Sequence, residues 1–85
     1  MNAEQAILLT VLAAKGDPTY ADHIQRQVPQ FTMARISLAD LHHVLGEMER
    51  KGELCATEGS REDDHGRRMM AWFITPKGKN RAHQA

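Results

Sequence analysis

Residues 37–52, SLADLHHVLGEMERKG, constrain the fold more than any other segment, because they predict one helix with both ends marked. Ser37 suits the N-cap and Gly52 suits a C-terminal stop. The apolar residues between them recur at helical spacing and form one stripe. They are Leu38, Leu41, Val44, Leu45 and Met48. In a chain of 85 residues, a helix over about residues 37–51 must cover a single small core.

Two further helices are predicted before this one. The first covers about residues 3–15, where Ile7, Leu8, Val11 and Leu12 share one face. The second covers about residues 19–28. We expect Thr19 to cap it, with Asp17 and Pro18 as an alternative start. Pro29 should end it, because a residue before proline is pushed out of the helical region.

A β-hairpin is predicted over about residues 53–75. The apolar runs ELCAT and MMAWFIT are its strands, and the polar segment with Gly59 and Gly66 is a long, projecting loop. Thr75 and Pro76 then open a last helix over residues 76–83. We expect that helix to fray, because it contains Gly78 and no large apolar residue.

This order predicts a single α+β domain over residues 1–85, with the winged helix-turn-helix fold. A three-helix core is followed by a two-stranded β-hairpin wing and a short C-terminal helix. The second and third helices are the helix-turn-helix pair, and the third is the recognition helix.

Two apolar patterns carry a resemblance to a known family. The third helix and the strand after it contribute Leu41, Leu45, Met48, Gly52 and Leu54. The second wing strand and the residues after it contribute Trp72, Ile74, Thr75 and Gly78. In both patterns the chain resembles the winged-helix domains of PadR-like transcriptional regulators, over about residues 7–81. The resemblance implies a DNA-binding regulator of transcription.

The main hypothesis is therefore a small sequence-specific DNA-binding protein from a bacterium or phage. The third helix would read bases in the major groove, and the wing would hold the backbone or the minor groove. The predicted DNA-binding residues are Arg35, Ser37, Ala39, His42, His43, Arg61, His65, Arg67 and Arg68. We expect double-stranded DNA as the partner, a homodimer as the active form, and no cofactor.

The charge distribution gives this hypothesis mixed support. The net charge is zero, but residues 65–85 carry five bases and no acid, so this segment is expected to add phosphate contacts. Residues 35–64 carry four bases and eight acids. The acids Glu62, Asp63 and Asp64 at the wing tip oppose deep insertion into DNA, since they repel phosphates.

The alternative is a winged-helix module that binds another protein through the hairpin or the acidic wing tip. The strand MMAWFIT is apolar on both faces. We expect Met70, Trp72 and Ile74 to cover the helices. The opposite face would then be a protein interface, made of Met69, Ala71 and Phe73.

The sequence gives little support to other classes of function. Five histidines and the single Cys55 show no metal-ligand spacing, and no catalytic motif is present, so we expect neither a metal site nor an enzyme. One cysteine cannot form an internal disulfide, which fits a cytoplasmic protein. The apolar run near the N-terminus is too short for a membrane span.

Overall fold

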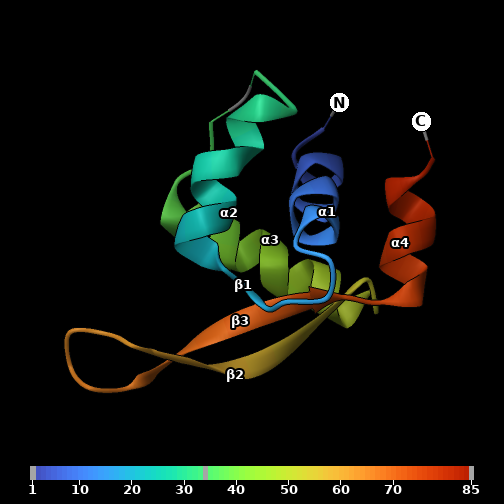
Figure 1. Cartoon of the computed structure of the whole chain (residues 1–85). Helices are drawn as coiled ribbons and strands as arrows, with labels where there is room; N and C mark the ends of the chain where they lie inside the picture. The colour runs from blue at the N-terminus through green and yellow to red at the C-terminus, as the bar shows by residue number, and fades with distance from the viewer. Residues whose placement is uncertain (1, 34, 85) are drawn as a thin grey trace.

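The computed structural model describes residues 2–33 and 35–84, and its helices lie on one side of a three-stranded sheet (Figure 1). The elements in chain order are α1 (Ala3–Ala13), β1 (Thr19–Tyr20), α2 (Ala21–Gln27), the 3₁₀ turn η1 (Val28–Gln30), α3 (Leu38–Arg50), β2 (Leu54–Glu62), β3 (Arg68–Ile74) and α4 (Pro76–Ala82). The predicted α+β architecture, three helices followed by a hairpin and a short helix, is confirmed.

Three helices begin at side-chain caps that the sequence marks. The side chains of Asn2, Ser37 and Thr75 each accept a hydrogen bond from the backbone amide three residues later, at 2.8, 3.1 and 3.0 Å. Each bond satisfies one of the amides that a helix N-terminus leaves without an intrahelical partner. At the other end of α3, Gly52 has a φ of +80°, which lets the chain turn sharply into β2.

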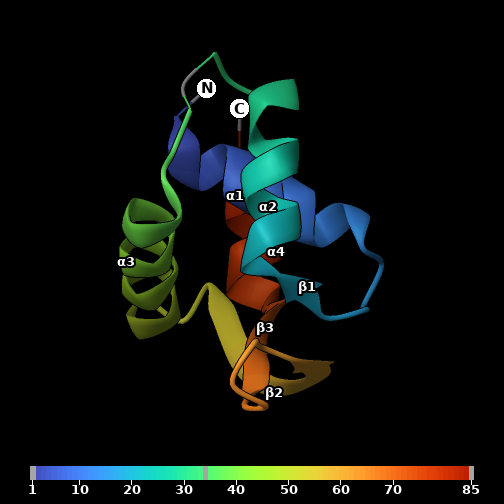
Figure 2. The same ribbon diagram turned by 90° about the vertical axis from the view of Figure 1, so that its left-hand side faces the viewer.

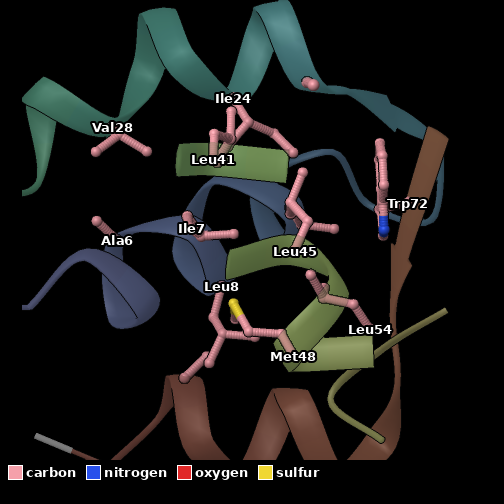
Figure 3. Close-up of a cluster of buried hydrophobic side chains, with 13 residues drawn as sticks. Ala6, Ile7, Leu8, Ile24, Val28, Leu41, Leu45, Met48, Leu54 and Trp72 are labelled. Atoms are coloured by element: carbon pink, nitrogen blue, oxygen red, sulfur yellow. The ribbon is translucent and has the colours of Figure 1, made fainter. Parts of the chain in front are cut away.

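The core lies between α1, α2 and α3 and is closed by the sheet (Figure 3). Its large buried side chains are Ile7, Leu8, Val11, Ile24, Val28, Leu41, Leu45, Met48, Leu54 and Trp72. Burying one such side chain contributes about 1.5–3 kcal/mol, so the stripe on α3 is the main link between the layers. Leu38 is a correction to the predicted stripe. It is 43% exposed, because the first turn of α3 extends past the core.

The predicted helix over residues 19–28 begins later than expected. Thr19 and Tyr20 instead form β1, which pairs antiparallel with Trp72 and Ala71 of β3. The side chain of Thr19 is buried and caps nothing, so the capping prediction was wrong. The sheet therefore has three strands in the order β1-β3-β2. A strand of two residues has no periodicity that a sequence pattern can reveal.

The first strand of the hairpin is longer than the apolar run that predicted it. β2 continues through polar residues as far as Glu62, with a shift in register between Glu58 and Glu62. Within the hairpin, only residues 63–67 lie outside the strands. The side chain of Asp63 stabilises this turn, because it accepts hydrogen bonds from the backbone amides of His65 and Arg67, both at 2.9 Å. The predicted long loop is a short closed turn.

Helix α4, which was expected to fray, is fastened to the rest of the domain. The Gln5 side chain donates hydrogen bonds to the carbonyl oxygens of Arg81 and Ala82, at 3.0 and 2.8 Å. The guanidinium of Arg81 pairs with the buried Glu53 at 2.7 Å and also contacts Glu4. These contacts span most of the chain, so the local composition of α4 gives no sign of them.

Candidate nucleic-acid interface

The exposed side of α3 lies opposite its buried stripe. Ala39, His43 and Gly46 fall on one outward row, because positions three and four apart share a helix face. Ala39 and His43 are exposed, and a β-carbon at Gly46 would meet nothing closer than 3.9 Å, an Arg50 nitrogen. This row carries little side-chain cover, so a partner could approach the helix backbone closely.

A groove of about 450 Å³ separates the first turns of α3 from the hairpin. It is lined by Ala21, Asp22, Leu38, His42, Asp63, Arg68, Met69, Met70 and Trp72. The rings of His42 and Trp72, which both line the groove, lie 6.1 Å apart between centroids and bring α3 and β3 together there. The predicted residues His42 and Arg68 thus border one surface, although they are far apart in sequence.

Each arginine of the wing, which we define as residues 58–68, faces a carboxylate. Arg67 lies 3.4 Å from Asp63. Arg68 lies 3.6 Å from Glu58. Arg61 makes two hydrogen bonds of 3.1 Å to Asp22 of α2, one from each terminal nitrogen. The three cations are therefore not equally available to an anionic ligand.

Tyr20 packs against Arg61, the wing arginine with the strongest ion pair. The Arg61 guanidinium carbon lies 4.5 Å from the centroid of the Tyr20 ring, within cation–π range. The tyrosine hydroxyl accepts hydrogen bonds from the backbone amides of Ser60 and Arg61, at 2.9 and 3.2 Å. Hydrogen bonds from the Arg61 side chain lower the pKa of Asp22, and the hydrogen bond with the Ser60 side-chain hydroxyl contributes most to a lowered pKa of Tyr20.

The charge on this face is close to balanced. On α3, Glu47 contacts Arg50 and lies 3.8 Å from His43. In residues 35–50 there are two bases and three acids, and in residues 58–68 three bases and four acids. The exposed Arg35 has no ion pair among the described residues.

The basic C-terminal segment is divided between two places. Arg67 and Arg68 belong to the wing, whereas Lys77, Lys79 and Arg81 belong to α4, which lies at the opposite end of the sheet from the hairpin turn (Figure 1). Arg81 is committed to Glu4 and Glu53. The positions of Lys77, Lys79 and Arg81 therefore give no support to the expectation that the whole segment holds phosphates.

The predicted protein-interface residues do not form one patch. Ala71 is fully buried, because the side chain of Tyr20 crosses from β1 to the amides of β2 over the strand between them. Met69 is half-buried at the groove, and Phe73 lines a different hollow beside residues 11–17. The large apolar side chain exposed on β3 is Met70, at 46%.

The residues of this surface that were not among the predicted site residues include Tyr20, Asp22, Leu38 and Met70. For the first two, the only available signal was the acid beside an aromatic in TYAD, which has no meaning until β1 is paired with β3. Within the described ranges, no three His, Cys, Asp or Glu side chains are grouped to hold a metal ion. Those ranges also contain no helix that is long and apolar enough to cross a membrane.

The chain resembles known proteins in its structure. No protein-family model and no curated protein matches the chain. Solved structures do match. A transcriptional regulator from Thermoplasma acidophilum superposes with a TM-score of 0.74 at 16% identity, over 94% of this chain and 72% of that one. The fold is a winged helix-turn-helix.

Other winged helices give the same result. A PadR-like transcriptional regulator from Bacillus cereus matches with a TM-score of 0.71 at 16% identity, over 95% of this chain and 74% of that one. A zinc-responsive MarR family member from Lactococcus lactis matches with a TM-score of 0.62 at 20% identity, over 96% of this chain and 49% of that one. In the winged helix of this chain, α3 is the third helix of the core and the β2–β3 hairpin carries the wing (Figure 2).

Proposed function

We propose that this protein binds duplex DNA in a sequence-specific manner and regulates transcription in a bacterium or phage. One observation carries the proposal: the first turns of α3 and the base of the wing border the same groove. In a winged helix this arrangement lets the recognition helix enter the major groove while the wing follows the backbone.

On α3, exposed residues of the outward row would contact the DNA bases. His43 offers ring nitrogens to base edges, and Ala39 offers a methyl group that suits thymine. His42, at the groove edge, completes this set. Ser37 and the free amides of the first turn suit a phosphate, because a helix N-terminus attracts anions. Arg35 is exposed beside them and adds a second phosphate contact.

On the wing, Arg67 and Arg68 are the proposed phosphate ligands. Each is exposed and makes one ion pair longer than 3.3 Å. Exposed pairs of this kind contribute about 0–1 kcal/mol, so exchanging the carboxylate for a phosphate costs little. The exposed His65 lies at the turn between the strands and would follow the same backbone.

The similarity to transcriptional regulators of known structure supports this role. We further propose that two copies act together as a homodimer in the cytoplasm. A dimer would read two half-sites about one helical turn of DNA apart, so its operator would be an inverted repeat. The proposed contacts need no cofactor.

Selection of the purified protein on random-sequence duplexes tests the proposal. We expect one motif to be enriched. His43→Ala should change that motif, while Arg67→Ala combined with Arg68→Ala should weaken binding to every sequence alike. An absence of duplex binding at low salt would refute DNA binding.

A protein-binding role is the second candidate. It is favoured by the excess of acids on α3 and the wing, and by the apolar side chains that the groove leaves exposed. These are Leu38 and Met70. Here a stoichiometric protein partner should be recovered, and Met70→Asp should abolish that complex. If DNA is the partner, the wild-type protein should recover no stoichiometric protein complex, and Met70→Asp should change nothing in this experiment.

A further inference from the structure

We infer that Asp22 sets the strength of DNA binding by competing with DNA phosphates for Arg61. This inference rests on the proposed function and adds to it a residue outside both α3 and the wing. Asp22 holds the Arg61 guanidinium and keeps it from the DNA backbone, so the wild-type protein makes one phosphate contact fewer than it would with Arg61 released.

The geometry of the pair is that of a tight clamp. Both terminal nitrogens of Arg61 donate to the two carboxylate oxygens of Asp22 in parallel, each at 3.1 Å. The planar fork of an arginine binds a phosphate with these same donors, so a bidentate carboxylate occupies them. The ring of Tyr20 covers the guanidinium, with 4.5 Å between the ring centroid and the guanidinium carbon.

The clamp distinguishes Arg61 from the other wing arginines. The acids that face Arg67 and Arg68 belong to the wing itself and make single, longer contacts of 3.4 and 3.6 Å. Asp22 belongs to α2, so its contact with Arg61 ties the wing to the helical core. Arg67 and Arg68 can therefore exchange their carboxylate partners readily, and Arg61, the third arginine of the wing, cannot.

The position of Asp22 makes the competition direct. Its side chain lines the groove between α3 and the wing and remains partly exposed to solvent. A DNA backbone in that groove would meet the carboxylate of Asp22 and the occupied fork of Arg61 together. The carboxylate thus weakens binding in two ways, by repelling phosphate and by holding a cation.

Asp22→Asn tests this inference, because it removes the charge and keeps the size of the side chain. The readout is the affinity for a labelled random-sequence duplex across a salt series, measured by fluorescence anisotropy. We expect tighter binding and a log–log salt slope steeper by about 0.9, the value for one more phosphate contact. The advantage of the variant should then be about threefold larger at 50 mM than at 200 mM salt.

A double-mutant cycle assigns the effect to Arg61. In an Arg61→Ala background, Asp22→Asn should no longer change the slope. Asp64→Asn is the matched control, because it removes one acid of the wing turn that has no ion pair among the described residues. Its small gain should persist without Arg61. Because Asp22 also lies 3.5 Å from Arg26, the slope change must also survive in an Arg26→Ala background.

Arg61→Lys provides a second test that leaves Asp22 in place. Lysine keeps the charge and loses the fork, so the clamp loosens and the slope should steepen toward that of Asp22→Asn. An equal gain from Asp22→Asn with and without Arg61, or an unchanged slope in both variants, would overturn the inference and leave DNA binding intact. No duplex binding by any variant would overturn the proposed function as well.

Discussion

Gly59 lies directly beneath Tyr20: a β-carbon at position 59 would be 2.4 Å from the tyrosine hydroxyl oxygen. Only a hydrogen atom fits there, and this lets the ring reach the amides of Ser60 and Arg61. The side chain of Tyr20 therefore ties the wing to β1. This contact joins the short strand, the irregular part of β2 and the clamp on Arg61 in one structural unit.

Gly59→Ala should displace the Tyr20 ring and break its hydrogen bonds to the wing. We expect a loss of about 1–3 kcal/mol in the free energy of unfolding, typical of overpacking, measured by urea denaturation. Gly46→Ala on the open side of α3 is the matched control. It should raise stability by up to about 1 kcal/mol, because alanine favours a helix. Equal effects at the two glycines would contradict the account of the Tyr20 contact.

Gly78→Ala should be more damaging still. A β-carbon there would be 2.1 Å from the backbone carbonyl oxygen of Glu53 and 2.9 Å from Ile74. Backbone cannot yield as a tyrosine ring can, so α4 would have to move away from Glu53. We expect a loss of roughly 3 kcal/mol or more in the same urea experiment. A variant with wild-type stability would show that α4 does not pack where we place it.

Arg81→Met should destabilise the protein by about 3 kcal/mol, because it leaves the carboxylate of Glu53 buried without its partner. Arg26→Ala breaks an exposed pair with Asp22 and should cost less than about 1 kcal/mol. The comparison separates a structural ion pair from a surface one. Similar losses in both variants would argue against the role assigned to Arg81.

Acid should weaken the same network. The hydrogen bond from Arg81 lowers the pKa of Glu4 below its usual 4.5, so the folded state favours the ionised carboxyl. The stabilisation is present above the unfolded pKa and is lost as the pH falls through the folded pKa. The free energy of unfolding should therefore decline below about pH 5, and Glu4→Gln should flatten that decline. An unchanged pH profile in Glu4→Gln would contradict this assignment.

The sequence predicted those features that depend on neighbouring residues. Spacing over a few positions predicts the caps of α3 and α4, most of the α3 stripe and the hairpin, and the structure contains these features. It did not predict β1, because Thr19 and Tyr20 form a strand only by pairing with β3 in the folded domain. The fastening of α4 through Gln5 and Arg81 was missed for a similar reason, since it depends on contacts across the whole chain.

The candidate site divides in the same way. The wing arginines were visible as a basic run, and the exposed histidines of α3 followed from the helical period. The clamp of Asp22 on Arg61 was invisible, because its partners are 39 residues apart and meet only in the folded domain. Exposure of Leu38 was missed because periodicity gives the face of a helix and not how far the core extends along it.

DNA binding by α3 and the wing is the central claim, and the salt dependence of duplex affinity tests it most directly. The logarithm of the binding constant should fall linearly with the logarithm of salt concentration. Arg67→Ala combined with Arg68→Ala should reduce the slope by about two. Lys15→Ala combined with Lys79→Ala removes the same charge away from the groove and should leave the slope unchanged. A binding constant that does not change with salt concentration, or equal slopes in wild type and the wing variant, would contradict the account.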